Sequence, residues 1–154
     1  MRSALALVSS AAILAAACGG AAVPSPSPSP TVKPLAVITI TSPKGGEAVT
    51  AGTVVVTWEV SDVTLVPAAS AQKPEDYHVH LAMDLDATQW IGKDTVVPAG
   101  DANPNPTRLI HSAGKTFSFV NVTAGEHTVT IWLSLASHVS VKPPVSASVK
   151  FTAR

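Results

Sequence analysis

Two histidines stand two residues apart in segment 77–86, which reads YHVHLAMDLD. Alternate residues of a β-strand point to the same side, so His78 and His80 are expected to project together from one face. The neutral imidazole is the commonest protein ligand for transition metals such as zinc and copper, and three or four ligands usually complete such a site. The spacing therefore makes metal binding the first chemistry to consider.

Two further histidines are candidates for the same site. The strand that holds the histidine pair is expected to lie antiparallel to a strand at 127–135, so the end of the second strand lies beside the start of the first. His138 follows that end directly. A strand at 106–112 on the other side would bring His111 to the same corner. The sequence thus predicts that four of the five histidines converge, with copper or zinc as the ion.

The same face supports two other interpretations. His78 and His80 fall on the polar side of an alternating strand, where histidines also occur as solvated side chains without a role. Trp132 and Thr130 share that face in the neighbouring strand, and an exposed tryptophan offers apolar area and a hydrogen-bond donor. This arrangement predicts a surface for a glycan or protein ligand, unless the long loop at 84–107 covers the tryptophan.

Short runs of alternating apolar and polar residues predict the elements that position these side chains. Including the strand at 106–112, they lie at 35–41, 53–60, 77–84, 106–112, 115–122, 127–135 and 145–152. No stretch after residue 17 shows a helical period. About seven antiparallel strands with turns between them are typical of an all-β sandwich. The alternation directs these residues into its core: Trp58, Leu81, Phe119, Ile131 and Val149.

One turn narrows the topology further. The segment VNVTAGEHTVTI resembles the tyrosine corner, Leu-x-Pro-Gly-x-Tyr, that opens the penultimate strand of immunoglobulin-like and fibronectin-like domains. Val122, Ala124, Gly125 and His127 occupy the matching positions. The resemblance implies an immunoglobulin-like sandwich. It also gives His127 the structural role of the corner tyrosine, a hydrogen bond back to the backbone, so His127 is not counted as a ligand.

The order of motifs over residues 77–153 looks like that of a family of uncharacterised bacterial extracytoplasmic domains. The shared pattern runs His-x-His-Leu, VVPAGD, His-x-x-Gly, Gly-x-His-Thr-Val, then His and Pro-Pro. The relatives carry His-His-His-Leu and Pro-Gly-x-His-Thr-Leu, where this chain has Tyr77 for the first histidine and Ala124 for the proline. The family has no established activity, so the resemblance supports the fold and the histidine positions only.

The first residues resemble a bacterial lipoprotein signal peptide, predicted at 1–17. Arg2 precedes an apolar run that is too short to span a bilayer comfortably. LAAAC, which ends at the only cysteine, resembles the lipobox and implies diacylation of Cys18. Ordinary cleavage near Ala17 is the alternative. Residues 18–34, with alternating Pro and Ser, are predicted to form an extended tether to one domain at 35–154.

Composition and motifs exclude several classes of function. Ten basic and ten acidic residues give a net charge of zero, which does not favour a nucleic-acid partner. We find no Gly-x-Ser-x-Gly, phosphate loop or His-Glu-x-x-His, and Asp84 and Asp86 lack the further oxygens of a calcium loop. The sequence therefore predicts a non-catalytic binding domain, lipid-anchored on the extracytoplasmic side of a bacterial membrane. A histidine-based copper- or zinc-binding lipoprotein is the alternative.

Overall fold

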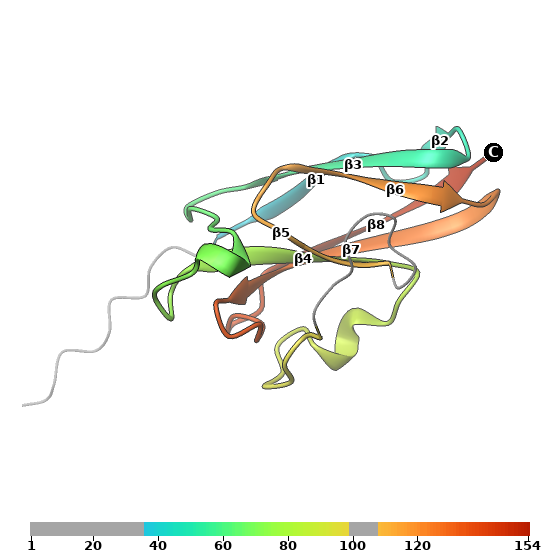
Figure 1. The fold of residues 1–154 in the computed structure, drawn as a ribbon. Helices are drawn as coiled ribbons and strands as arrows, with labels where there is room; N and C mark the ends of the chain where they lie inside the picture. Colours follow the sequence, from blue (N-terminus) through green and yellow to red (C-terminus); the bar gives the residue numbers. More distant parts are fainter. Residues whose placement is uncertain (1–35, 99–107) are drawn as a thin grey trace, which may run out of the picture. The chain divides into compact units, whose positions relative to one another are not determined.

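The computed structural model describes residues 36–98 and 108–154, which form an all-β domain (Figure 1). Its strands are β1 (Ile38–Ser42), β2 (Ala48–Val49), β3 (Gly52–Val60), β4 (Tyr77–Met83), β5 (Leu109–Ser112), β6 (Thr116–Val122), β7 (Gly125–Leu135) and β8 (Ser146–Ala153). Two short 3-10 helices lie in loops, η1 (Ala68–Ser70) and η2 (Ala87–Gln89). The predicted all-β fold is confirmed. The predicted signal peptide, Cys18 and the tether lie outside the described residues.

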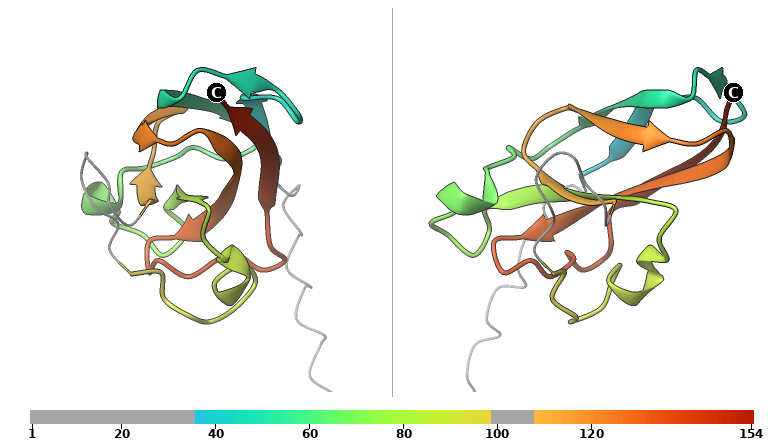
Figure 2. Two further views of the ribbon diagram at one scale, coloured as in Figure 1. Left: turned by 90° about the vertical axis from the view of Figure 1, so that its right-hand side faces the viewer. Right: turned by 45° about the vertical axis from the view of Figure 1, so that its right-hand side comes forward.

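The strands form two sheets, with order β1-β3-β6 in one and β2-β8-β7-β4-β5 in the other. All neighbouring strands are antiparallel except β2 and β8. The two sheets form separate layers (Figure 2). This strand order is that of an immunoglobulin-like sandwich, in which β5 is an additional edge strand beside β4 in the larger sheet. No helix among the described residues has the length and apolar character needed to cross a bilayer.

The core between the sheets follows the predicted alternation. Trp58, Leu81, Phe119 and Ile131 are buried in one apolar cluster, and Val149 packs against it while partly exposed. Because the register in a sheet is set by which face is buried, these positions confirm the assignment of inward and outward faces along each strand. That assignment places the opposite side chains of β4, including the histidine pair, outside this core.

Several strand boundaries differ from the prediction by one to three residues, and one short strand was not predicted. The predicted strand at 106–112 begins at Leu109, and Arg108 before it has a φ of 55°, a conformation that does not continue a strand. The two-residue β2 was not predicted, since a strand this short shows no alternation. It joins the edge of the larger sheet through Ala48 and Val49.

Trp58→Ala is expected to lower the free energy of unfolding by about 3–5 kcal/mol, because it removes the largest side chain of the core and leaves a cavity. Trp58 is 1% exposed. Urea denaturation followed by circular dichroism measures this loss. The matched control is Val55→Ala, on the outer face of the same strand, where a change within about 0.5 kcal/mol is expected. Similar losses in both variants would contradict the register of β3.

Candidate metal centre

The outer face of β4 carries the histidine pair. Val79, Leu81 and Met83 enter the core, so His78 and His80 point to the other side of the same strand. The neighbouring strands β5 and β7 determine which side chains lie beside the two histidines. In the register of the sheet, His80 stands directly opposite His111 of β5 and directly opposite Trp132 of β7. The predicted pairing of these three strands is therefore present.

His138 comes from the turn that follows β7. The backbone of this turn is closed by hydrogen bonds from His138 N to Leu135 O and from Leu135 N to Val139 O, both of 2.9 Å. His138 has a φ of 62°, in the left-handed region. Its ring centroid lies 4.8 Å from that of His78 and 4.6 Å from that of His111. The tight turn thus brings a fourth imidazole to the three on the strands.

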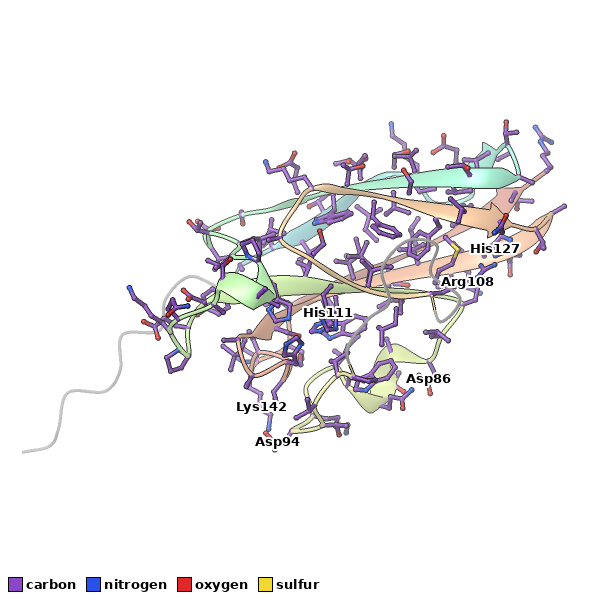
Figure 3. All side chains as sticks on the ribbon, viewed as in Figure 1. Asp86, Asp94, Arg108, His111, His127 and Lys142 are labelled. Atoms are coloured by element: carbon purple, nitrogen blue, oxygen red, sulfur yellow. The ribbon has the colours of Figure 1, made fainter. Side chains whose placement is uncertain are left out.

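The four imidazoles form one compact group, which we call the histidine cluster: His78, His80, His111 and His138. One ring nitrogen from each lies within 4.8 Å of the others. Of these residues, Figure 3 labels His111, which is part of β5 in the larger sheet. Sequence reasoning predicted the convergence of all four, and the structure brings all four together.

The cluster is not a solvated face. His78 and His80 are 1% and 0% exposed, and Trp132 is 0% exposed. The sequence-based interpretations of solvated histidines and of an exposed aromatic platform at Trp132 and Thr130 are therefore wrong. Thr130 is partly exposed and bonds the hydroxyl of Ser148 at 3.0 Å. The physical reason is a loop that removes this face from water.

Segment 85–98, which we call the cover, lies over the outer face of the larger sheet (Figure 1). Trp90 stacks on Trp132 with ring centroids 5.8 Å apart and 7° between the planes. These two tryptophans belong to a second apolar cluster, completed by Ala82, Ala87, Val97 and Leu109. The sequence left open whether the loop at 84–107 covers Trp132, and the burial of Trp90, Val97 and Trp132 shows that the cover does so.

The cover is bonded to the turn that carries His138. Val97 N donates to the carbonyl of His138 at 2.9 Å, and Gly92 N donates to the hydroxyl of Ser140 at 3.0 Å. Lys142 and Asp94 form an ion pair of 2.6 Å at the outer surface (Figure 3). These bonds connect the turn that carries His138 to the cover, so the position of the fourth imidazole depends on the position of the cover.

Burial keeps the imidazoles of His78, His80 and His111 neutral. Loss of hydration, followed by the imidazoles of His138 and His111, lowers the pKa of His78 to about 4. Loss of hydration, with the three neighbouring imidazoles as lesser causes, lowers the pKa of His80 to about 2. The pKa of His111 is lowered for the same main reason. Neutral rings have a free nitrogen lone pair, which is the form that binds a metal.

Hydrogen bonds select the nitrogens that face the centre. His111 Nε2 lies 3.1 Å from the carbonyl of Pro98 and must donate to it, which leaves Nδ1 of the neutral ring as a lone pair. His80 Nδ1 pairs with the hydroxyl of Ser134 at 2.8 Å. Such partners orient the rings of metal-binding histidines. Both His111 and His80 therefore present one defined nitrogen.

Four other nitrogens of the cluster have no hydrogen-bond partner in the part of the chain that the structure describes. His80 Nε2, both ring nitrogens of His78 and His138 Nδ1 are buried and find no hydrogen-bond partner among the described residues. A buried polar atom without a partner costs about 1–3 kcal/mol. A metal ion between the rings would satisfy one nitrogen of each histidine. The donor set therefore fits zinc and copper, which both accept imidazole.

His127 lies at the other end of β7, away from the cluster. Its Nε2 is 2.9 Å from the carbonyl of Thr123, four residues earlier, and this bond is the backbone contact expected of a corner residue. Its Nδ1 is 2.8 Å from Asp84, which also accepts from Thr128 N at 2.9 Å and from Arg108 at 3.0 Å. Figure 3 labels His127 and Arg108 side by side. Sequence reasoning missed the roles of Asp84 and Arg108, because no local pattern connects them.

His127→Ala is expected to lower the free energy of unfolding by about 1–3 kcal/mol, since it removes the buried imidazole that bonds both Asp84 and the Thr123 carbonyl. Metal affinity should not change, because His127 is outside the cluster. Thermal unfolding and metal titration of the same sample measure the two effects. A variant that kept its melting temperature and lost metal would contradict this assignment.

No family model matches this chain, and no curated protein matches it. The geometry of the histidine cluster is therefore what indicates a function for this domain.

Proposed function

We propose that this domain binds one copper or zinc ion through His78, His80, His111 and His138. The supporting observation is that four imidazoles converge within 4.8 Å while four of their buried nitrogens have no partner among the described residues. Four tetrahedral ligands at 2.0–2.1 Å from zinc stand roughly 3.4 Å apart, so the widest pair must close by roughly 1.4 Å on binding. Rotation of the rings and of the His138 turn supplies this movement.

The closed ligand set favours a binding protein over an enzyme. Metal sites that hold the ion with four protein ligands are structural or storage sites, whereas catalytic sites keep one position open for water or substrate. Here the cluster offers four ligands and lies beneath the cover. We therefore assign no catalytic role to these histidines, and a glycan or protein partner stays a prediction without a described surface to support it.

The proposed setting is the bacterial cell envelope. The lipobox-like LAAAC and the Pro/Ser-rich tether support a diacylated Cys18 that holds the domain on the extracytoplasmic side of a membrane. In that setting the ligands of the cluster would meet metal ions that enter the envelope. A lipid-anchored metal-binding domain accounts for the anchor, the tether and the cluster together.

Titration of chain 18–154 with Cu²⁺ and Zn²⁺ tests the metal site. Cys18→Ser is included so that the thiol contributes no ligand. Calorimetry should give one ion per chain. Because Trp132 stacks on His80 with centroids 5.3 Å apart, Cu²⁺ should quench tryptophan fluorescence and Zn²⁺ should not. Heats without saturation at one equivalent for both ions, together with no retention of Cu⁺, would refute the proposal.

Cys18→Ser in the full chain is expected to move the protein from the membrane fraction to the soluble fraction, because the acyl chains on Cys18 attach it to the membrane. Fractionation after a high-salt wash measures this. His78→Ala, which leaves the anchor intact, serves as the control and should stay with the membrane. A Cys18→Ser protein that still sediments with the membrane would contradict the lipobox assignment.

A further inference from the structure

The charge of the donor set distinguishes between possible ions. All four ligands of the cluster are imidazoles, and no carboxylate or thiolate of the described residues joins them. Neutral imidazoles leave the charge of the ion unchanged. A divalent ion would therefore bring two uncompensated charges into the site, and Cu⁺ would bring one.

Burial makes that difference large. His78 and His80 are almost fully buried, and the apolar cluster of Trp90, Trp132 and Val97 packs at the same face. Placing a charge in such a medium is costly, and in the Born description the cost grows with the square of the charge. The apolar shell around a metal site raises or lowers its redox potential through this effect. Burial here disfavours the divalent state.

The groups behind the ligands are also neutral. Metal-binding histidines often donate their second nitrogen to a carboxylate, which supplies negative charge. In this protein a hydroxyl, from Ser134, pairs with His80, and a carbonyl, from Pro98, pairs with His111. The cover carries two acids: Asp94 is 87% exposed and paired with Lys142, and Asp86 is exposed and accepts a hydrogen bond from Thr88 N. Asp84 is paired with Arg108 and His127. These two partners lie away from His111 of the cluster (Figure 3).

Copper is favoured over zinc by the general order of affinities for nitrogen ligands. Cu²⁺ prefers a flattened, tetragonal arrangement, whereas a d¹⁰ ion imposes no geometry of its own. The three ligands on β4 and β5 are held by strand pairing, and the fourth by the His138 turn, which is bonded to the cover. Resting on the metal site proposed above, we infer that the ion is copper and that the domain holds it preferentially as Cu(I).

The reduction potential of the bound copper tests this inference. An electrode supplies the one electron that converts bound Cu(II) to Cu(I), and copper in excess imidazole serves as the solvated four-nitrogen reference. We expect Cu(I) to be favoured at least about 100-fold relative to the reference, which is a potential about 120 mV higher at 59 mV per tenfold change. A potential equal to or below the reference would overturn the inference.

A matched pair of variants tests the cause. Ser134→Asp places a carboxylate beside His80 and should favour Cu(II) about tenfold, a fall of about 59 mV. Ser134→Asn has nearly the same shape without the charge and should shift the potential much less. Equal shifts would overturn the charge argument. If neither variant folds, the wild-type comparison with the imidazole reference still decides.

Two further measurements separate the possible failures. Asp101 is the one acid of segment 99–107, which lies outside the described residues. The variant Asp101→Asn should leave the reduction potential of the bound copper unchanged. A higher potential in this variant would show that a carboxylate contributes to the site, and would overturn the inference. Competition with a colorimetric Cu(I) chelator measures retention. Failure to retain copper in either oxidation state, and zinc as well, would refute the metal site itself. Retention of Zn²⁺ or Cu²⁺ in preference to Cu(I) would refute only the inference about oxidation state.

Discussion

His80→Ala is expected to weaken copper or zinc binding on the order of 10³-fold, or about 4 kcal/mol. Loss of a group behind a metal ligand costs 10–100-fold in affinity, and loss of the ligand itself costs more. His80 lies close to two other ligands, since its ring centroid is 4.2 Å from that of His111 and 4.7 Å from that of His78. Its removal therefore deletes one ligand and also the side chain that packs between His78 and His111.

A graded series of variants makes this prediction specific. Ser134→Ala removes the partner of His80 Nδ1 and should cost about 10–100-fold in affinity. His127→Ala removes a histidine outside the cluster and should cost nothing. Competition with a chelator of known affinity measures all three variants, and circular dichroism checks that each is folded. An unchanged affinity in His80→Ala would mean that the metal, if bound, is held elsewhere.

The metal-free domain is expected to lose about 4 kcal/mol of its free energy of unfolding between pH 7.5 and pH 5. Burial lowers the pKa of His78 to about 4 and that of His80 to about 2, whereas both rings have a value near 6.5 in the unfolded chain. Between these limits the unfolded chain binds more protons, so acid favours unfolding. The stability that these neutral rings allow is present above pH 6.5 and decreases as the pH falls, by about 1.4 kcal/mol per unit for each histidine.

Urea denaturation at the two pH values, with a chelator present, measures this loss. The control is the double variant His78→Ala/His80→Ala, in which the difference between pH 7.5 and pH 5 should shrink. Bound metal should protect the domain, by about 2.7 kcal/mol at a free concentration 100 times the dissociation constant. Equal stability of the wild-type domain at both pH values would contradict the burial of the two neutral rings.

Several features of this protein follow from local sequence patterns. The period of two residues predicted the strands and their inward faces, because strand geometry alternates whatever the surroundings are. It also placed His78 and His80 on one side of β4. Antiparallel pairing of that strand with its two neighbours then brought His111 and His138 to the same place, since the register followed from the buried face.

Only the tertiary structure decided whether that face meets water. Alternation distinguishes the two faces of a strand, but a loop such as the cover has no periodic pattern that says where it packs. Stacking of Trp90 on Trp132, 42 positions along the chain, buried the polar face, and this burial keeps His78 and His80 neutral. The pairing of Asp84 with Arg108 and His127 likewise joins residues 24 and 43 positions apart. Such contacts depend on the packing of distant segments, which no local spacing encodes.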